Sequence, residues 1–279
     1  VRALLARELA DSNDERGGHS WGFAKLDGVL SISRGLGALR PNAFQMVGPE
    51  ILMAHTRWAT HGDTTVENAH PFEIDDIVGA HNGIIYNHDE LNKLHGRAFE
   101  VDSRHLFAHL AAGLSFDDIE GYGAIEWVYR DKPPKVYLCR LSRSGELAIH
   151  YIGPLDNPIG VVWSSDASHL EDALEAVGLE DHGAYRVDEG IVYAVEDGRL
   201  WLTKRKLHLS SKAREAKPTW REYTTPMKVK LKLLEDPADD ELSTMVGEES
   251  EGDYEFRCPT CDWWIWVEAD SDEILCDRC

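Results

Sequence analysis

Short apolar runs, bounded by Gly, Asn and Asp, recur along the first two hundred residues of the chain. Some alternate apolar and polar positions and others are continuously apolar, and runs of this length and spacing predict strands and hairpins. We expect them in HSWGFAKLDGVLSISRG (19–35), EILMAHTRW (50–58), DIVGAHNGIIYN (76–87), KVYLCRLS (135–142), ELAIHYIG (146–153), IGVVWSSD (159–166) and GIVYAVEDGRLWLTK (190–204).

Three segments have helical patterns instead. They are residues 2–11, residues 102–112, for which Asp102 or Ser103 is a suitable cap, and residues 167–177. The strands do not alternate with helices as βαβ units would. The pattern therefore predicts an α+β domain built in layers.

Charge divides the remainder of the chain. Residues 201–233 hold ten Lys or Arg, whereas residues 234–279 hold sixteen Asp or Glu and two Arg. We expect a globular domain over 1–205, a basic and then acidic connector over 206–253, and a small module over 254–279. The net charge of −21 argues against general binding to nucleic acid or to anionic membranes. Contact between the basic connector and nucleic acid remains open, although a solvated face is the interpretation we favour.

Three places could carry chemistry, and each has an ordinary structural explanation. Arg57 follows a strand, where its guanidinium could bind a carboxylate or lie on the surface. Asn82 and Gly83 could donate to an oxyanion or form a hairpin turn. Asp102 could hold an ammonium group or cap a helix. Taken singly, the ordinary explanation is favoured at each place.

Their joint order changes this interpretation, because HTRWATHG (55–62), HNGIIYNHDEL (81–91) and EVDSRHL (100–106) resemble the class II glutamine amidotransferases. The glutaminase domain of glucosamine-fructose-6-phosphate aminotransferase is the most similar. RGGHSWGFA, VVWSSDASHL and RVDEGIVYAV extend the resemblance over about 200 residues. It implies the four-layer αββα sandwich of N-terminal-nucleophile hydrolases and the hydrolysis of glutamine to glutamate.

The resemblance also implies roles for individual residues. Arg57 would bind the glutamine α-carboxylate inside a loop shaped by Trp58, Thr60 and His61. Asp102 would bind the α-ammonium group, and Asn82 with Gly83 would form the oxyanion hole. His19 stands where the family usually has Asp, so we interpret it as structural.

The family's nucleophile is a cysteine at the mature N-terminus, whose own α-amino group is the general base. This chain begins with Val1, and Cys139 lies within an apolar run that predicts a buried thiol. The chain as given is therefore expected to be inactive. Either about ten residues carrying the cysteine precede Val1 in the intact protein, which we favour, or the protein binds glutamine without hydrolysing it.

The pattern CPTC…CDRC places Cys258, Cys261, Cys276 and Cys279 as two C-x-x-C pairs. Four thiolates in this spacing predict a structural Zn²⁺ site in a zinc ribbon, with WWIWVEA as one of its strands. A pair of disulfides is the alternative, but a cytoplasmic enzyme favours zinc.

No apolar run is long enough for a membrane span, which by default indicates a cytoplasmic protein. The sequence shows no acceptor domain and no P-loop. We therefore expect a glutaminase subunit that delivers ammonia to a synthase on another chain. The alternative is an inactive glutamine-binding scaffold whose zinc ribbon recruits a partner or nucleic acid.

Overall fold

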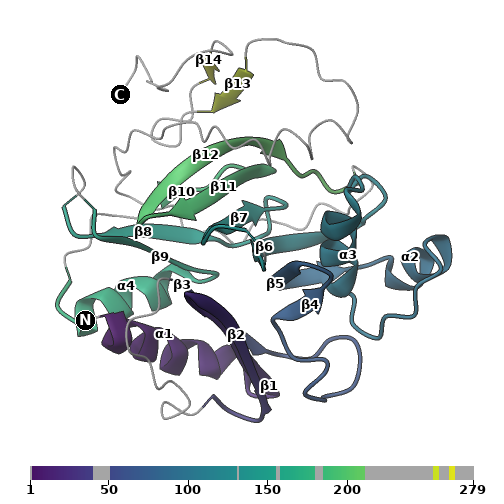
Figure 1. The fold of residues 1–279 in the computed structure, drawn as a ribbon, viewed down its shortest axis with the longest axis horizontal. Coiled ribbons are helices and arrows are strands. Elements are labelled where there is room, and N and C mark those ends of the chain that lie inside the picture. Colours follow the sequence, from purple (N-terminus) through teal and green to yellow (C-terminus); the bar gives the residue numbers. More distant parts are fainter. Residues whose placement is uncertain are drawn as a thin grey trace.

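The computed structural model describes residues 2–39, 51–130, 132–154, 158–179 and 185–210, together with the backbone of 254–257 and 264–267. Among these residues, antiparallel sheets occupy the middle of the molecule and helices cover both outer faces (Figure 1). No helix in the described ranges combines the length and the apolarity that crossing a membrane requires.

Two three-stranded sheets form one layer. In the first, in the order β2-β1-β3, the hairpin of β1 (Ser20–Asp27) and β2 (Val29–Leu36) pairs through β1 with β3 (Ile51–Arg57). In the second, β8 (Ala148–Ile152) lies between β10 (Tyr185–Arg186) and β9 (Gly160–Ser164). All these pairs are antiparallel. Both β3 and β9 are consequently edge strands among the described residues.

A six-stranded antiparallel sheet forms the second layer, in the order β12-β11-β7-β6-β5-β4. Its central strands pair over most of their length, so that Ile77 lies opposite Tyr129 and Ile85 opposite Gly121. The strands are β4 (Phe72–Ile74), β5 (Ile77–Ile85), β6 (Gly121–Tyr129), β7 (Val136–Arg140), β11 (Ile191–Glu196) and β12 (Arg199–Lys206).

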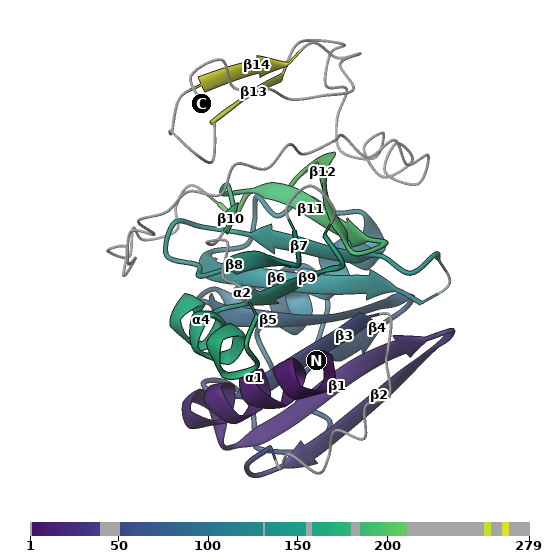
Figure 2. The same ribbon diagram turned by 90° about the vertical axis from the view of Figure 1, so that its left-hand side faces the viewer.

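The helices lie in two outer layers. One contains α1 (Arg2–Gly17) and α4 (Ala167–Ala176), which pack on each other and against β3 and β9. The other contains α2 (His88–Leu94) and α3 (Arg104–Ala112), and α3 packs on β4 and β5. Figure 2, turned by 90°, shows α1 and α4 side by side along the outer face of the strands.

Three apolar clusters fill the spaces between these layers. The first, which includes Met53, Val78 and Ile149, lies between the two sheet layers. The second contains Phe107 and Trp127 and joins the six-stranded sheet to α2 and α3. The third joins α1 and α4 to β8 and β9 through side chains such as Leu170. Burial of this apolar surface is the main force that holds the four layers together.

Every strand and helix expected from the sequence forms, although α1 is longer than predicted. The sequence reasoning missed β6, because this central strand is buried on both faces and therefore lacks a clean alternation. It also missed α2, which has only seven residues. The packed domain extends past residue 205, since Leu207 belongs to the second apolar cluster.

The C-terminal module is described only as two short strands. β13 (Tyr254–Arg257) pairs with β14 (Trp264–Val267) in an antiparallel register that sets Tyr254 opposite Val267. A strand was expected in WWIWVEA, and β14 confirms it. The four expected zinc ligands, Cys258, Cys261, Cys276 and Cys279, lie outside the described residues, as does the connector from 211 to 253.

Candidate functional site

Arg57 ends β3 and is only 4% exposed, so the expectation of a surface arginine was wrong. Its guanidinium donates hydrogen bonds to the backbone carbonyls of His61 and Asp63, the latter at 3.4 Å. These bonds hold the loop after β3 around the side chain. A guanidinium has five N–H donors. The described residues accept two of these bonds, so three N–H groups remain for a ligand.

His19 holds the same loop from the other side. Its Nδ1 accepts a hydrogen bond from the Ala59 backbone N–H at 3.0 Å, and its ring stacks on Trp58 with the centroids 4.5 Å apart. The indole is 64% exposed, so it forms the outer wall of the loop. These contacts are the structural role that we expected for His19.

Asn82 and Gly83 lie inside β5, so the hairpin-turn interpretation of this dipeptide was wrong. They pair with Ala124 and Gly123 of β6. A Cβ added to Gly83 would stand 2.0 Å from the carbonyl oxygen of Tyr122, so only glycine fits this close approach of the two strands. No described residue is hydrogen-bonded to the Asn82 side chain, which leaves its amide available.

The Asp102 carboxylate does not cap α3, contrary to the simpler expectation. The N-cap position is Ser103, which makes no side-chain cap bond. Instead, Asp102 is 2% exposed and its Oδ2 accepts the Ile85 backbone N–H at 2.7 Å, which ties the start of α3 to β5. His61 Nδ1 lies 4.0 Å from the same oxygen.

His81 and Ser103 support this arrangement. The sequence reasoning gave His81 no role and considered Ser103 only as a helix cap. His81 Nε2 faces the carbonyl of Tyr122 at 3.2 Å, so it carries the ring proton. Its Nδ1 therefore accepts from the Ser103 hydroxyl at 2.9 Å. Burial lowers the pKa of His81 although the charge of Asp102 opposes this, and the neutral ring is favoured. Both residues adjoin predicted site residues, which is the signal that could have identified them.

One cavity of about 830 Å³ brings most of the predicted residues together. Its wall includes Arg57, Trp58, Thr60, Asn82, Gly83 and Asp102. His61 is not part of this wall, although its Nδ1 lies 4.0 Å from the Asp102 carboxylate. The cavity continues between the edge strands β3 and β9 and over α1, where Ala54, Val162 and Leu9 line it. We call this part of the cavity, between β3 and β9, the channel.

Glu126 is one of several acidic side chains that line the cavity. It lies on β6, and its Oε2 accepts a hydrogen bond of 2.5 Å from Trp163 Nε1 on β9. Burial raises the pKa of Glu126 to about 7, which the bond from Trp163 only partly offsets. The sequence gave no indication of this pair, because its members are 37 residues apart and meet only through the packing of two sheets.

The variant Glu126→Gln tests this environment. The pKa of Glu126 is higher in the folded chain than in the unfolded chain, so the protonated side chain stabilises the fold below about pH 4.3. This stabilisation is lost as the pH rises through about 7. Glutamine keeps the acceptor for Trp163 but does not ionise. We expect the stability gain of the variant over the wild type to be larger at pH 8.5 than at pH 5 by about 2–3 kcal/mol, in urea unfolding. An equal effect at both pH values would contradict the assignment.

Relatives of known activity match this domain. The chain is 32% identical over 171 residues to glutamine–fructose-6-phosphate aminotransferase (isomerizing) of Bordetella pertussis, a match that covers 54% of this chain and 26% of that protein. The corresponding enzyme of Zymomonas mobilis is 32% identical over 208 residues, which cover 65% and 33%. That of Vibrio vulnificus is 39% identical over 127 residues, covering 39% and 21%. The chain spans about a third or less of these relatives.

Solved structures show the same fold. Glutamine phosphoribosylpyrophosphate amidotransferase from B. subtilis, in complex with ADP and GMP, superposes with a TM-score of 0.50 at 18% identity, over 73% of this chain and 46% of that chain. No protein-family model matches the chain. The predicted αββα sandwich of N-terminal-nucleophile hydrolases is confirmed, as is the likeness to glutamine amidotransferases.

Proposed function

We propose that the protein is a glutaminase subunit that hydrolyses glutamine to glutamate and delivers the ammonia to a synthase on another chain. The observation that carries this proposal is a single cavity whose wall holds a buried cation, a buried anion and an uncommitted amide, namely Arg57, Asp102 and Asn82. The named activities of the relatives support the choice of glutamine as the substrate.

An α-amino acid has one carboxylate and one ammonium group, and the cavity offers a partner for each. The free N–H groups of Arg57 suit a bidentate carboxylate. The Asp102 carboxylate uses Oδ2 for the Ile85 N–H and retains acceptor capacity for the ammonium group. Because both residues are buried, each pairing would be shielded from water and would contribute more than a surface ion pair.

The oxyanion of the tetrahedral intermediate would meet Asn82 and Gly83. N–H groups alternate sides along a strand, and the N–H of Tyr86 points toward β6, where it bonds to Glu120. The N–H of Ile85 points the opposite way, toward Asp102, and that of Gly83 therefore does too. Gly83 can thus donate to a ligand together with the Asn82 amide. Losing one such donor typically costs about 3–4 kcal/mol of transition-state stabilisation.

The nucleophile is not among the described residues of the cavity. Cys139 is fully buried in β7, and burial raises the pKa of its thiol to about 12, so it is not a candidate. We place the family's N-terminal cysteine on a strand between β3 and β9. The lining of the channel by two edge strands supports this place, because the inserted strand could pair with both.

The C-terminal module is proposed to bind one structural Zn²⁺ through Cys258, Cys261, Cys276 and Cys279. The hairpin of β13 and β14 supports this, because its connection contains the first C-x-x-C pair in the sequence. The metal would supply much of the folding free energy of so small a module. Its surface is a candidate for contact with the synthase or with nucleic acid.

Glutamate release from L-glutamine tests the proposal, using the protein produced with its natural amino terminus. We expect stoichiometric glutamate and ammonia, and loss of both when the N-terminal cysteine is replaced by alanine. A folded protein that binds glutamine without releasing glutamate would instead support the scaffold alternative. Co-purification from the native source then identifies the synthase that accepts the ammonia.

A further inference from the structure

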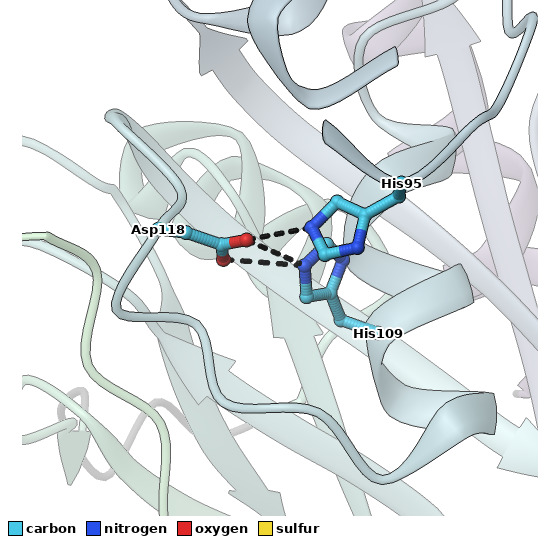
Figure 3. Close-up of side chains that lie close together, drawn as sticks. All are labelled: His95, His109 and Asp118. Atoms are coloured by element: carbon cyan, nitrogen blue, oxygen red, sulfur yellow. Dashed lines mark hydrogen bonds and ion pairs between the residues drawn. The ribbon is translucent and has the colours of Figure 1, made fainter. Parts of the chain in front are cut away.

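Two histidines and one aspartate converge near the end of α3, and none of them lines the cavity (Figure 3). His95 follows α2, His109 lies in the last turn of α3, and Asp118 lies in the loop before β6. The carboxylate is 2.6 Å from His95 Nε2 through Oδ2 and 3.2 Å from His109 Nε2 through Oδ1. One donor atom from each residue lies within 4.8 Å of the other two.

One carboxylate oxygen of the cluster has no hydrogen-bond partner among the described residues: Asp118 Oδ1 is buried and lies 3.2 Å from His109 Nε2. His109 Nδ1 lies 2.7 Å from the carbonyl oxygen of His105 and 3.0 Å from Arg97 Nη1. The carbonyl accepts only from a protonated Nδ1, whereas the guanidinium donates only to a bare one, so the two contacts compete. When the shorter contact forms, the neutral ring presents a bare Nε2 to Asp118.

Arg97 and the carbonyl of His105 both lie at Nδ1 of His109, whereas Nε2 faces the carboxylate of Asp118. The neutral ring with a bare Nε2 is the form that binds metal ions. Arg97 lies at Nδ1, across the ring from Nε2, and therefore does not obstruct an ion there.

The spacing of the three donor atoms fits a small divalent cation. Tetrahedral Zn²⁺ bonds to nitrogen and oxygen at about 2.0–2.1 Å, which separates its ligand atoms by about 3.3 Å. The nitrogen–oxygen distances here are 2.6 Å, 3.2 Å and 3.4 Å, and the three donor atoms lie within 4.8 Å of one another. Small shifts of the side chains, above all a separation of His95 from Asp118 by several tenths of an ångström, would complete the geometry. Asp118 has a side chain that is 32% exposed, which gives an ion and a water ligand access from solvent.

We propose that His95, His109 and Asp118 form a mononuclear Zn²⁺ site, with water in the fourth position. The His109–His105 carbonyl bond is then the outer-shell contact that fixes the ligating tautomer. The ion would join the end of α2, the end of α3 and the loop before β6. Because Asp102 lies two residues before the first residue of α3, the site braces the helix that positions this carboxylate.

The matched pair Asp118→Asn and Asp117→Asn tests the site. Both variants remove one negative charge from the same loop, but Asp117 is exposed and outside the cluster. We expect one fewer tightly bound Zn²⁺ per chain in Asp118→Asn than in the wild type, and no loss in Asp117→Asn, by elemental analysis of the dialysed full chain. Zinc held by the four terminal cysteines is common to all three proteins and cancels in this difference.

A titration with ZnCl₂ gives the affinity directly. We expect Asp118→Asn and a second variant, His95→Gln, each to weaken binding at this site by about 100-fold or more. Circular dichroism confirms that each variant is folded, and neither substituted side chain is fully buried. Equal zinc content and affinity in the wild type, Asp118→Asn and His95→Gln would overturn the proposal.

Discussion

Replacing Asp102 by asparagine is expected to weaken the binding of L-glutamine by about 100-fold while leaving the fold intact. In the wild type, the Asp102 carboxylate accepts the Ile85 N–H at 2.7 Å. Asparagine keeps an oxygen that can accept this bond, so the link between β5 and α3 survives. It removes the buried negative charge opposite the ligand ammonium group. Loss of one partner from a buried charge pair costs about 2–5 kcal/mol, of which we take about 3 kcal/mol here.

Isothermal titration of the full chain with L-glutamine measures this effect. Asp89→Asn is the matched control, because Asp89 is an exposed carboxylate in the first turn of α2. It should bind glutamine like the wild type. If Asp102→Asn and Asp89→Asn bind equally well, Asp102 does not hold the ammonium group.

Mild acid is expected to destabilise the protein steeply, because several buried histidines are held neutral. Burial lowers the pKa of His70, His81 and His109, and lowers that of His105 to about 4. The unfolded chain binds protons at these rings near pH 6.5, whereas the folded chain does not. The free energy of unfolding therefore falls as the pH drops from about 6.5 toward 4, by about 1.4 kcal/mol per pH unit for each such ring.

Glu126 acts in the opposite direction, since its raised pKa favours the folded state at low pH. The four histidine rings lower the free energy of unfolding as the pH falls, and the one carboxylate opposes them. Near pH 5, the free energy of unfolding therefore falls by at most about 4 kcal/mol per pH unit. Total stabilities are about 5–15 kcal/mol, so acid unfolding within two pH units of 6.5 is expected. Urea titrations from pH 7 to 5, with chelator present to exclude bound metal, measure the slope. His105→Asn should reduce it by about a quarter to a third, and a wild-type stability that does not change over this range would contradict the account.

The sequence predicted the site better by the order of its motifs than by any single residue. Arg57 looked like a surface arginine because nothing local shows that β3 is covered by α1 and by the loop that the guanidinium itself holds. Asn82–Gly83 looked like a turn because this dipeptide is common in hairpin turns. In the structure it lies within a central strand, where Gly83 pairs with Gly123. In both cases tertiary packing overrode local preference.

Other features could not be predicted, because they depend on contacts between distant segments. Glu126 and Trp163 meet only when β6 and β9 pack face to face. The cluster of His95, His109 and Asp118 requires the ends of two helices and a loop to converge, and its spacing of fourteen and nine residues matches no metal motif. Such sites become visible only when distances and burial are known.

The central claim is that the cavity recognises both charges of glutamine, and calorimetric titration of the full chain with three ligands tests it most directly. L-Glutamine is compared with glutaramic acid, which lacks the α-amine, and with γ-aminobutyramide, which lacks the α-carboxylate. We predict that L-glutamine binds and that each analogue binds at least about 100-fold more weakly. A folded chain that does not bind L-glutamine, or that binds either analogue equally well, would contradict the claim.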